Sequence, residues 1–229
     1  MLNKGVTDVF FDLDHTLWDF EKNSALTFEK ILKQYSIPVS TTIFLKVYTP
    51  INFDYWKLYR EEKITKEELR YQRLKKTFDS LKISISNTII NQLSVAYIDN
   101  LSSYNYVFPE TFEILDYLKP KYELHIITNG FQEIQNKKLK KSNLYSYFNQ
   151  IINSEMAGVK KPNPYIFKLA LELANTEAVC SVMIGDNLEA DILGAQALGF
   201  KTIHFNTHNE ETHNFCPIIN NLSEIKKYL

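Results

Sequence analysis

Two aspartates stand where a short apolar run of the sequence ends, in the stretch VFFDLDHT. Asp12 and Asp14 lie two positions apart, and ionised carboxylates are seldom left beside a core without a partner. Three later apolar runs are also followed by polar side chains, namely Thr128 with Asn129, Lys161, and Asp186 with Asn187 and Asp191. Carboxylates, a hydroxyl and an ammonium group could together bind a charged ligand, provided that the fold brings these four places together.

The apolar runs indicate strands of a parallel sheet. We expect strands at 6–13, 123–130, 150–155, 181–187 and 201–206. Helical patterns accompany the later strands, at 109–119, 131–142, 164–173 and 190–198. Strands that alternate with helices predict an α/β fold, a Rossmann-like parallel sheet with right-handed crossovers and helices on both faces. Ligands of such sheets bind beyond the carboxyl ends of the strands, which is where the polar side chains fall.

One interval breaks this alternation. The first and second expected strands are separated by roughly a hundred residues, whereas a βαβ unit takes about 30. The interval carries helical patterns at 23–35, 42–62, 65–78 and 86–101; the third begins with a capping box, and Pro50 could split or kink the second. We therefore predict an α-helical cap domain at 17–103, inserted into a core formed by 1–16 and 104–229.

Composition limits the function classes. The 229 residues include 26 Lys and Arg against 27 Asp and Glu, a formal net charge of −1. This balance lacks the basic excess of a protein that coats nucleic acid, so no nucleic-acid polymer is expected as a partner. Cys180 and Cys216 form no CxxC pair and indicate reduced thiols. With no secretory pattern and no apolar run near the ~20 residues of a membrane span, we expect a cytoplasmic protein without membrane contact.

Four motifs in this order resemble those of the haloacid dehalogenase-like (HAD) superfamily, and specifically its aspartate-nucleophile phosphatases. They are DxDxT at Asp12–Thr16, a hydroxyl at Thr128, a lysine at Lys161 and GDxxxxD at Gly185–Asp191, each at the end of an expected strand. A lone DxD is an ordinary turn signal, but the set extends along the whole chain. The inserted helical segment matches the cap of many members. The acid at Asp14 favours phosphatase or phosphomutase chemistry over dehalogenation.

The resemblance implies phosphomonoester hydrolysis through an aspartyl-phosphate. Asp12 would attack phosphorus as the nucleophile. Asp14 would protonate the leaving oxygen and then deprotonate the attacking water. Thr128 Oγ and the backbone N–H of Asn129 would hold phosphoryl oxygens, and Lys161 would offset the charge of the phosphoryl group and of the nucleophile.

Charge counting indicates a metal ion. The carboxylates of Asp12, Asp186 and Asp191 and a phosphate monoester of about −2 charge face a single cation, Lys161. Unit charges about 4 Å apart interact by roughly 4 kcal/mol at an effective dielectric of ~20, so substrate would be repelled. Mg²⁺ suits carboxylates combined with a substrate phosphate. By the resemblance, its ligands are the carboxylates of Asp12 and Asp186 and the backbone carbonyl of Asp14.

Two further residues are expected just outside the metal ligands. Asp191 is interpreted as orienting Lys161 or a metal-bound water, and a first-turn acid favoured by the helix dipole is the simpler alternative. Asn187, which directly follows Asp186, is the second of these residues. The basic run KKLKK at 137–141 falls on an expected helix with Leu139 inward, and we interpret it as a solvated face. Among the histidines, His125 and His204 fall in expected strands and are assigned hydrogen-bonded structural roles, and no histidine is assigned to catalysis.

The run FDLDHTLWDFEKNS resembles the pyrimidine 5′-nucleotidase branch of the superfamily, in the residues His15, Trp18, Asp19, Phe20 and Asn23. This implies nucleoside 5′-monophosphates as small-molecule substrates. Trp18 could stack on a base or pack at the hinge. The alternatives are a sugar-phosphate phosphatase or phosphomutase on the same core, or a non-catalytic phosphate-binding regulatory protein. A monomer or homodimer is expected.

Overall fold

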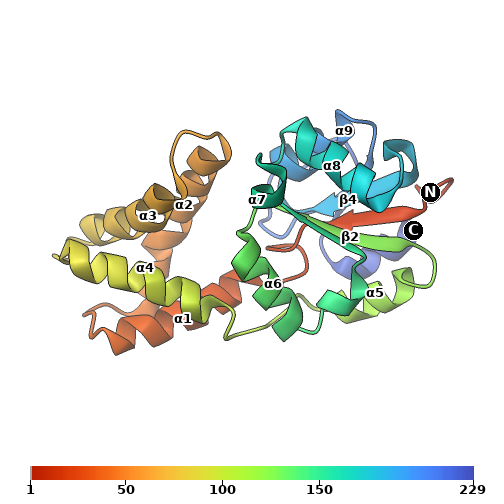
Figure 1. Ribbon diagram of the computed structural model, residues 1–229. Coiled ribbons are helices and arrows are strands. Elements are labelled where there is room, and N and C mark those ends of the chain that lie inside the picture. The colour runs from red at the N-terminus through yellow and green to blue at the C-terminus, as the bar shows by residue number, and fades with distance from the viewer. Residues whose placement is uncertain (1) are drawn as a thin grey trace. The chain divides into compact units, whose positions relative to one another are not determined.

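The computed structural model describes residues 2–229 (Figure 1). The chain divides into two compact units: one comprises the residues up to Phe20 together with Asn105–Leu229, and the other is Glu21–Tyr104. The predicted boundaries lie a few residues away, because Leu17–Phe20 stay with the first unit and residue 104 with the second. Trp18 forms isolated β-bridges with Asp14 and Val107, which tie the segment after the first strand to the sheet unit.

The sheet unit is built on a parallel sheet of six strands in the order β3-β2-β1-β4-β5-β6. These are β1 (Asp8–Phe11), β2 (Glu123–Thr128), β3 (Gln150–Asn153), β4 (Ser181–Gly185), β5 (Lys201–Phe205) and β6 (Ile218–Ile219). The α/β prediction is confirmed, and among the described residues the two-residue β6 is the one strand that was not predicted. The strand order reverses at β1, so the ends of β1, β2 and β4 meet where such sheets bind ligands.

Helices cover both faces of this sheet. They are α5 (Thr111–Leu118), α6 (Gln132–Lys141), α7 (Ser154–Ala157), α8 (Pro164–Ala174) and α9 (Gly194–Gln196), with 3₁₀ segments η1 (Tyr145–Tyr147), η2 (Ala178–Cys180) and η4 (Leu222–Lys227) and a π-helical segment η3 (Leu188–Leu193). Figure 1 shows α8 and α9 over one face and α5 over the other. The predicted helix at 190–198 is thus a π-helical turn followed by a short α-helix.

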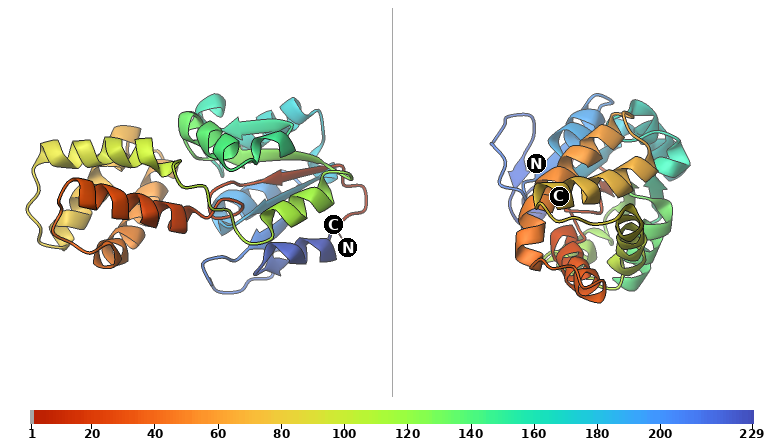
Figure 2. Two further views of the ribbon diagram at one scale, coloured as in Figure 1. Left: turned by 90° about the horizontal axis from the view of Figure 1, so that it is seen from below. Right: turned by 90° about the vertical axis from the view of Figure 1, so that its left-hand side faces the viewer.

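The buried strands explain why the core forms where it does. Every residue of β1 is buried, as expected for a central parallel strand covered on both faces. Phe10 and Met183 point to the α8 face, where they pack in one cluster with Ile166, Phe167 and Phe200. Figure 2 shows the beginning and the end of the described chain side by side, and the amides of residues 2 and 3 donate to the carbonyl of residue 228.

A buried polar pair lies at the opposite end of β1 from the aspartate motif. His125 Nε2 lies 2.9 Å from Asp8 Oδ1, and because a carboxylate can only accept, the nitrogen is the donor. His125 Nδ1 is buried with no hydrogen-bond partner among the described residues. Burial therefore lowers the pKa of His125, although Asp8 acts in the opposite direction. The predicted structural role of this histidine is confirmed, and it is the neutral imidazole that the fold accommodates.

The histidine makes the protein sensitive to acid. The pKa of His125 in the folded protein lies below the ~6.5 of an unfolded chain. The stability that the neutral imidazole contributes is therefore complete above that pH and is lost as the pH falls below it. We expect the melting temperature to fall between about pH 7.5 and pH 5, and to fall less in His125→Gln, whose amide donates to Asp8 and takes no proton. Thermal unfolding followed by circular dichroism measures this. Equal pH dependence in both proteins would contradict it.

The second unit is helical. Its helices are α1 (Phe20–Gln34), α2 (Thr41–Arg60), α3 (Lys66–Ser80) and α4 (Asn87–Leu101). Side chains of Ser40, Thr65 and Ser86 cap the last three helices, and the capping box predicted at Thr65 is present with Glu68. Pro50 does not split α2, which continues through it. An inserted helical domain between the first and second strands is therefore confirmed.

An aromatic centre holds the four helices together. The ring of Phe28 lies 4.5 Å from that of Tyr48 and 4.6 Å from that of Tyr97, measured between centroids. Arg73 is buried beside them, where it donates to Asn52 Oδ1 at 2.9 Å and lies 5.1 Å from the Tyr97 ring. This unit therefore has a core of its own, with a charge satisfied by an amide and by aromatic faces. Within residues 2–229, no helix has the length and hydropathy of a transmembrane span.

Candidate active site

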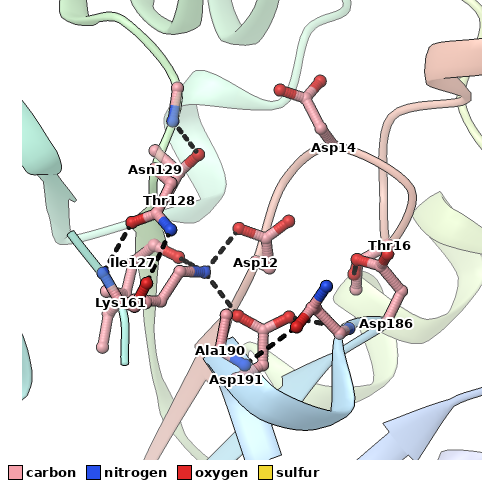
Figure 3. A network of polar contacts seen from close by, with 12 residues as sticks. Asp12, Asp14, Thr16, Ile127, Thr128, Asn129, Lys161, Asp186, Ala190 and Asp191 are labelled. Atoms are coloured by element: carbon pink, nitrogen blue, oxygen red, sulfur yellow. Dashed lines mark hydrogen bonds and ion pairs between the residues drawn. The ribbon is translucent and has the colours of Figure 1, made fainter. Parts of the chain in front are cut away.

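Lys161 is the centre of the polar network at the carboxyl ends of the strands (Figure 3). Its Nζ donates to Asp12 Oδ1 and to the carbonyl of Ile127, each at 2.6 Å, and lies 2.6 Å from Asp191 Oδ1. The side chain is only 2% exposed. Burial lowers the pKa of Lys161, but the two carboxylates raise it by more, so the pKa lies above its ordinary value. A permanent ammonium group is therefore enclosed between two acids.

Three buried carboxylates surround this ammonium group. Oxygens of Asp12, Asp186 and Asp191 all lie within 4.8 Å of one another. Burial raises the pKa of Asp12 well above its ordinary value, and Asp191 and Asp186 raise it further while Lys161 opposes them. Burial also raises the pKa of Asp186, against the hydrogen bond from His208. One ammonium does not balance three acids, and the site lacks positive charge.

The residues fit a hard divalent cation such as Mg²⁺. The donors are carboxylate oxygens, which are the ligands that Mg²⁺ prefers, and burial together with the neighbouring carboxylates raises the pKa of Asp12. Asp12 and Asp186 each have an oxygen that does not contact Lys161. Both oxygens of Asp191 are engaged, because Oδ1 pairs with Lys161 and Oδ2 accepts from the backbone N–H of Asn187 at 3.0 Å. The contact of Asp191 with Lys161 is the one expected of a residue that orients this ammonium group.

The loop after β4 is shaped to hold Asp191. Asn187 Oδ1 accepts from the backbone N–H of Ala190 at 2.8 Å and so begins the π-helical turn η3. Gly185 leaves room for the acid: a Cβ there would lie 2.3 Å from Asp191 Oδ2 and 2.5 Å from its Cγ. No side chain fits at that position without moving Asp191. The glycine of the GDxxxxD motif is thus required by packing against the acid that pairs with Lys161.

Thr128 and Asn129 lie at the end of β2 beside this network. Thr128 Oγ1 accepts from the backbone N–H of Gly130 at 3.1 Å and from Gln135 Nε2 at 2.8 Å. The Asn129 side chain clamps the backbone of Lys161: its Oδ1 accepts from the Lys161 N–H at 2.7 Å and its Nδ2 donates to the Lys161 carbonyl at 3.0 Å. Asn129 therefore fixes the loop that supplies the ammonium group, a role that the sequence did not suggest.

Asp14 lies apart from the Lys161 network (Figure 3). Its Oδ1 accepts from Lys138 Nζ at 2.6 Å and its Oδ2 from Gln135 Nε2 at 3.0 Å. Both partners come from α6, and both are buried. The expectation that KKLKK forms a solvated face is therefore wrong for Lys138, whose side chain is 2% exposed, because Asp14 supplies the opposite charge that lets an ammonium be buried.

Comparison with known proteins identifies the family. Residues 9–205 match the family described as Haloacid dehalogenase-like hydrolase. The chain belongs to this family. Two relatives are the pyrimidine 5′-nucleotidases YjjG of Escherichia coli and PynA of Streptococcus pneumoniae, each 31% identical over 81% of this chain and 80% and 78% of their own lengths, respectively. The magnesium-bound crystal structure of the HAD-hydrolase YfnB from Bacillus subtilis is similar, with a TM-score of 0.87, 26% identity and 97% of each chain covered.

These findings confirm that the chain is a HAD hydrolase, and therefore an enzyme, and that its sequence resembles the pyrimidine 5′-nucleotidase branch. The structure places four of the motif residues of this hydrolase, Asp12, Lys161, Asp186 and Asp191, in one buried cluster. Thr128 directly follows Ile127, whose carbonyl accepts from Lys161 Nζ, and the Asn129 side chain binds the backbone of Lys161. The catalytic, phosphate-binding and metal-binding roles of these residues stay predictions.

Sequence reasoning missed several members of the hydrolase site. Thr16 Oγ1 donates to Asp186 Oδ1 at 3.1 Å, and His208 Nε2 lies 3.3 Å from Asp186 Oδ2. The DxDxT motif carried a signal for Thr16, whereas a polar loop gave none for His208. Gln135 and Lys138 are three residues apart, on the same face of α6 as Ile134 and Leu139, so the helical period could have found them. His204, as expected, has a structural role, with Nε2 2.8 Å from the Asp186 carbonyl.

Proposed function

We propose that this hydrolase cleaves phosphate monoesters, with Asp12 as the nucleophile and pyrimidine nucleoside 5′-monophosphates as substrates. The observation that carries the proposal is the buried pair of Asp12 and Lys161, 2.6 Å apart, within a group of carboxylates that lacks positive charge. Such a site suits a bound divalent cation together with an anionic phosphate ester, whose phosphorus atom is the electrophile that the Asp12 carboxylate would attack. Thr128 and the start of α6 lie beside it, and a helix N-terminus favours phosphate.

The reaction is two displacements at phosphorus. In the first, an oxygen of Asp12 bonds to phosphorus while the bond from phosphorus to the ester oxygen breaks, and Asp14 gives its proton to that oxygen. In the second, water attacks phosphorus, its proton passes to Asp14, and the bond to Asp12 breaks to release inorganic phosphate. Lys161 holds the Asp12 carboxylate in place and offsets phosphoryl charge, while Thr128 Oγ and the Asn129 N–H bind phosphoryl oxygens.

Mg²⁺ is the proposed cofactor. Asp12 and Asp186 would hold it through carboxylate oxygens and Asp14 through its backbone carbonyl, with Asp191 and Asn187 outside the ligand shell. When bound, the ion supplies the positive charge that the three acids lack and makes a doubly negative ester attractive. The protein's own contribution is a set of buried carboxylate donors that the strand ends bring together.

The substrate class is proposed from two supports. The run that follows Asp14 resembles that of pyrimidine 5′-nucleotidases, and two relatives carry that name at 31% identity.

Trp18 is completely buried, with Lys138 Nζ 4.3 Å from its ring centroid. Of the two roles predicted for it, packing fits the structure and base stacking does not, so a base would be recognised by other residues.

The proposal also covers the role of the helical unit and the cellular location of the enzyme. We expect Glu21–Tyr104 to act as a cap that admits substrate and excludes bulk water, because its point of insertion follows the loop of Asp12 and Asp14. The enzyme would act in the cytoplasm on small-molecule phosphate monoesters, as a monomer or homodimer.

A substrate panel tests the function. Phosphate release from UMP, dUMP and dTMP is compared with release from hexose phosphates and phosphoglycolate, with Mg²⁺ present. We expect kcat/KM for the pyrimidine nucleotides to exceed that for the others by at least ~10-fold, the effect of about 1.4 kcal/mol of differential transition-state binding. Preference for a hexose phosphate would favour the sugar-phosphate phosphatase. Binding of phosphate esters without turnover would favour the regulatory protein.

A further inference from the structure

Lys138 is a buried cation that the proposed reaction does not use. It lies on α6, outside the four motifs, and its ammonium group is covered by Trp18 and Phe20, whose ring centroids lie 4.3 Å and 5.3 Å away. A buried ammonium is costly unless an opposite charge is bound to it. The described structure meets that cost with the carboxylate of Asp14, at 2.6 Å. Because Lys138 is buried against Asp14, the position of the Asp14 carboxylate is fixed by that of the lysine.

Gln135 holds the other oxygen of the same carboxylate. Its Nε2 is shared between Asp14 Oδ2 at 3.0 Å and Thr128 Oγ1 at 2.8 Å, so one amide links the acid–base residue to the phosphate-binding hydroxyl. The link depends on Gly130, where a Cβ would lie 2.3 Å from Gln135 Nε2. The spacing between Asp14 and Thr128 is therefore set by a side chain that is itself 1% exposed and enclosed.

We propose that Lys138 and Gln135 are positioning residues for Asp14, which hold its carboxylate beside Thr128 for the second displacement, the hydrolysis of the phosphorylated enzyme. Both carboxylate oxygens of Asp14 accept hydrogen bonds from α6, so this helix sets the direction in which the carboxylate faces. The water proton goes to this carboxylate as the bond between phosphorus and Asp12 breaks. The inference rests on the proposed function and assigns these two α6 residues to one of its two steps.

Pre-steady-state kinetics of Lys138→Met on p-nitrophenyl phosphate test the inference. Its leaving group needs little protonation, so the first displacement does not depend on Asp14, whereas the second does. We expect a burst of p-nitrophenol close to one equivalent of enzyme, then a steady rate roughly 10²-fold below wild type, the lower end of what a general base contributes. Intact mass after acid quenching should show the phosphorylated enzyme accumulating. Gln135→Met should show the same pattern, and it carries the test if Lys138→Met fails to fold.

Two controls separate positioning from a general structural effect. Lys137→Met changes the neighbouring exposed lysine of the same helix and should leave both phases as in wild type. The double variant Asp14→Asn with Lys138→Met should be no slower than Asp14→Asn alone, because a residue that acts through Asp14 has nothing left to position. Losses that multiply in the double variant would overturn the inference, and so would Lys138→Met with equal slowing of both phases or with wild-type rates.

Failure of this inference differs from failure of the proposed function. If the wild type turns over no monoester and Asp14→Asn never carries a phosphoryl group, the proposed reaction itself is wrong. If the wild type is active and Asp14→Asn accumulates phosphorylated enzyme while Lys138→Met and Gln135→Met do not, only the role of the α6 residues is rejected.

Discussion

Asp12→Asn is expected to reduce turnover of phosphate monoesters on the order of 10⁴-fold or more, because removal of a nucleophile leaves only binding and electrostatic contributions. An amide oxygen can still accept from Lys161, so the buried network and the fold should persist. Steady-state phosphate release measures the loss, and circular dichroism checks the fold. Intact mass after acid quenching should show a phosphoryl group on the wild type but never on Asp12→Asn.

The matched control is Asp116→Asn, an exposed aspartate on α5 of the same unit whose carboxylate accepts from the Tyr147 hydroxyl. It removes one carboxylate of the same kind outside the cluster and should keep wild-type turnover. Substantial activity in a folded Asp12→Asn would reject Asp12 as the nucleophile. Loss in both variants would instead point to a general effect of charge.

Removing divalent metal with EDTA is expected to lower turnover by roughly 10²- to 10³-fold, the result of losing a few kcal/mol of transition-state stabilisation. The physical reason is the cluster of Asp12, Asp186 and Asp191, whose negative charge Lys161 alone does not balance. Addition of Mg²⁺ in excess of the chelator should restore the rate, measured again as phosphate release.

Asp186→Asn gives the matched test of the same site. Its amide oxygen can still accept from Thr16, but it lacks the negative charge, so the Mg²⁺ concentration that gives half-maximal activity should rise at least ~10-fold. Asp116→Asn should leave that concentration unchanged. Full activity of the wild type in EDTA, with no metal detected in the protein, would contradict the assignment of the cluster to a metal ion.

Much of the fold follows from local patterns. Short apolar runs such as VFFDL are explained by burial on both faces of a parallel sheet, and Thr65 marks the start of a helix through a capping box with its near neighbour Glu68. The long helical interval between the first two strands was equally visible. Such features depend on a residue and its near neighbours, which is why their positions agree with the structure to within a few residues.

The candidate site was accessible for a related reason. Asp12, Thr128 and Asp186 each follow the end of a strand, and the carboxyl ends of parallel strands meet at one edge of the sheet. Once the strands were recognised, topology alone placed these residues together. The boundary near residue 17 was less accurate, because Trp18 stays with the sheet unit through a bridge to Val107, which is distant in sequence.

By itself, then, the sequence determined the class of fold, the inserted helical unit and the residues gathered at the strand ends, since each rests on local pattern and strand order. Only the tertiary structure decided which charged side chains are buried and which residues neutralise them. Lys138 looked like a surface lysine until Asp14, 124 positions away, was found against it, and Trp18 looked available to a ligand until it was found enclosed. Burial of a charge depends on a partner brought from elsewhere in the chain, and no local pattern encodes that partner.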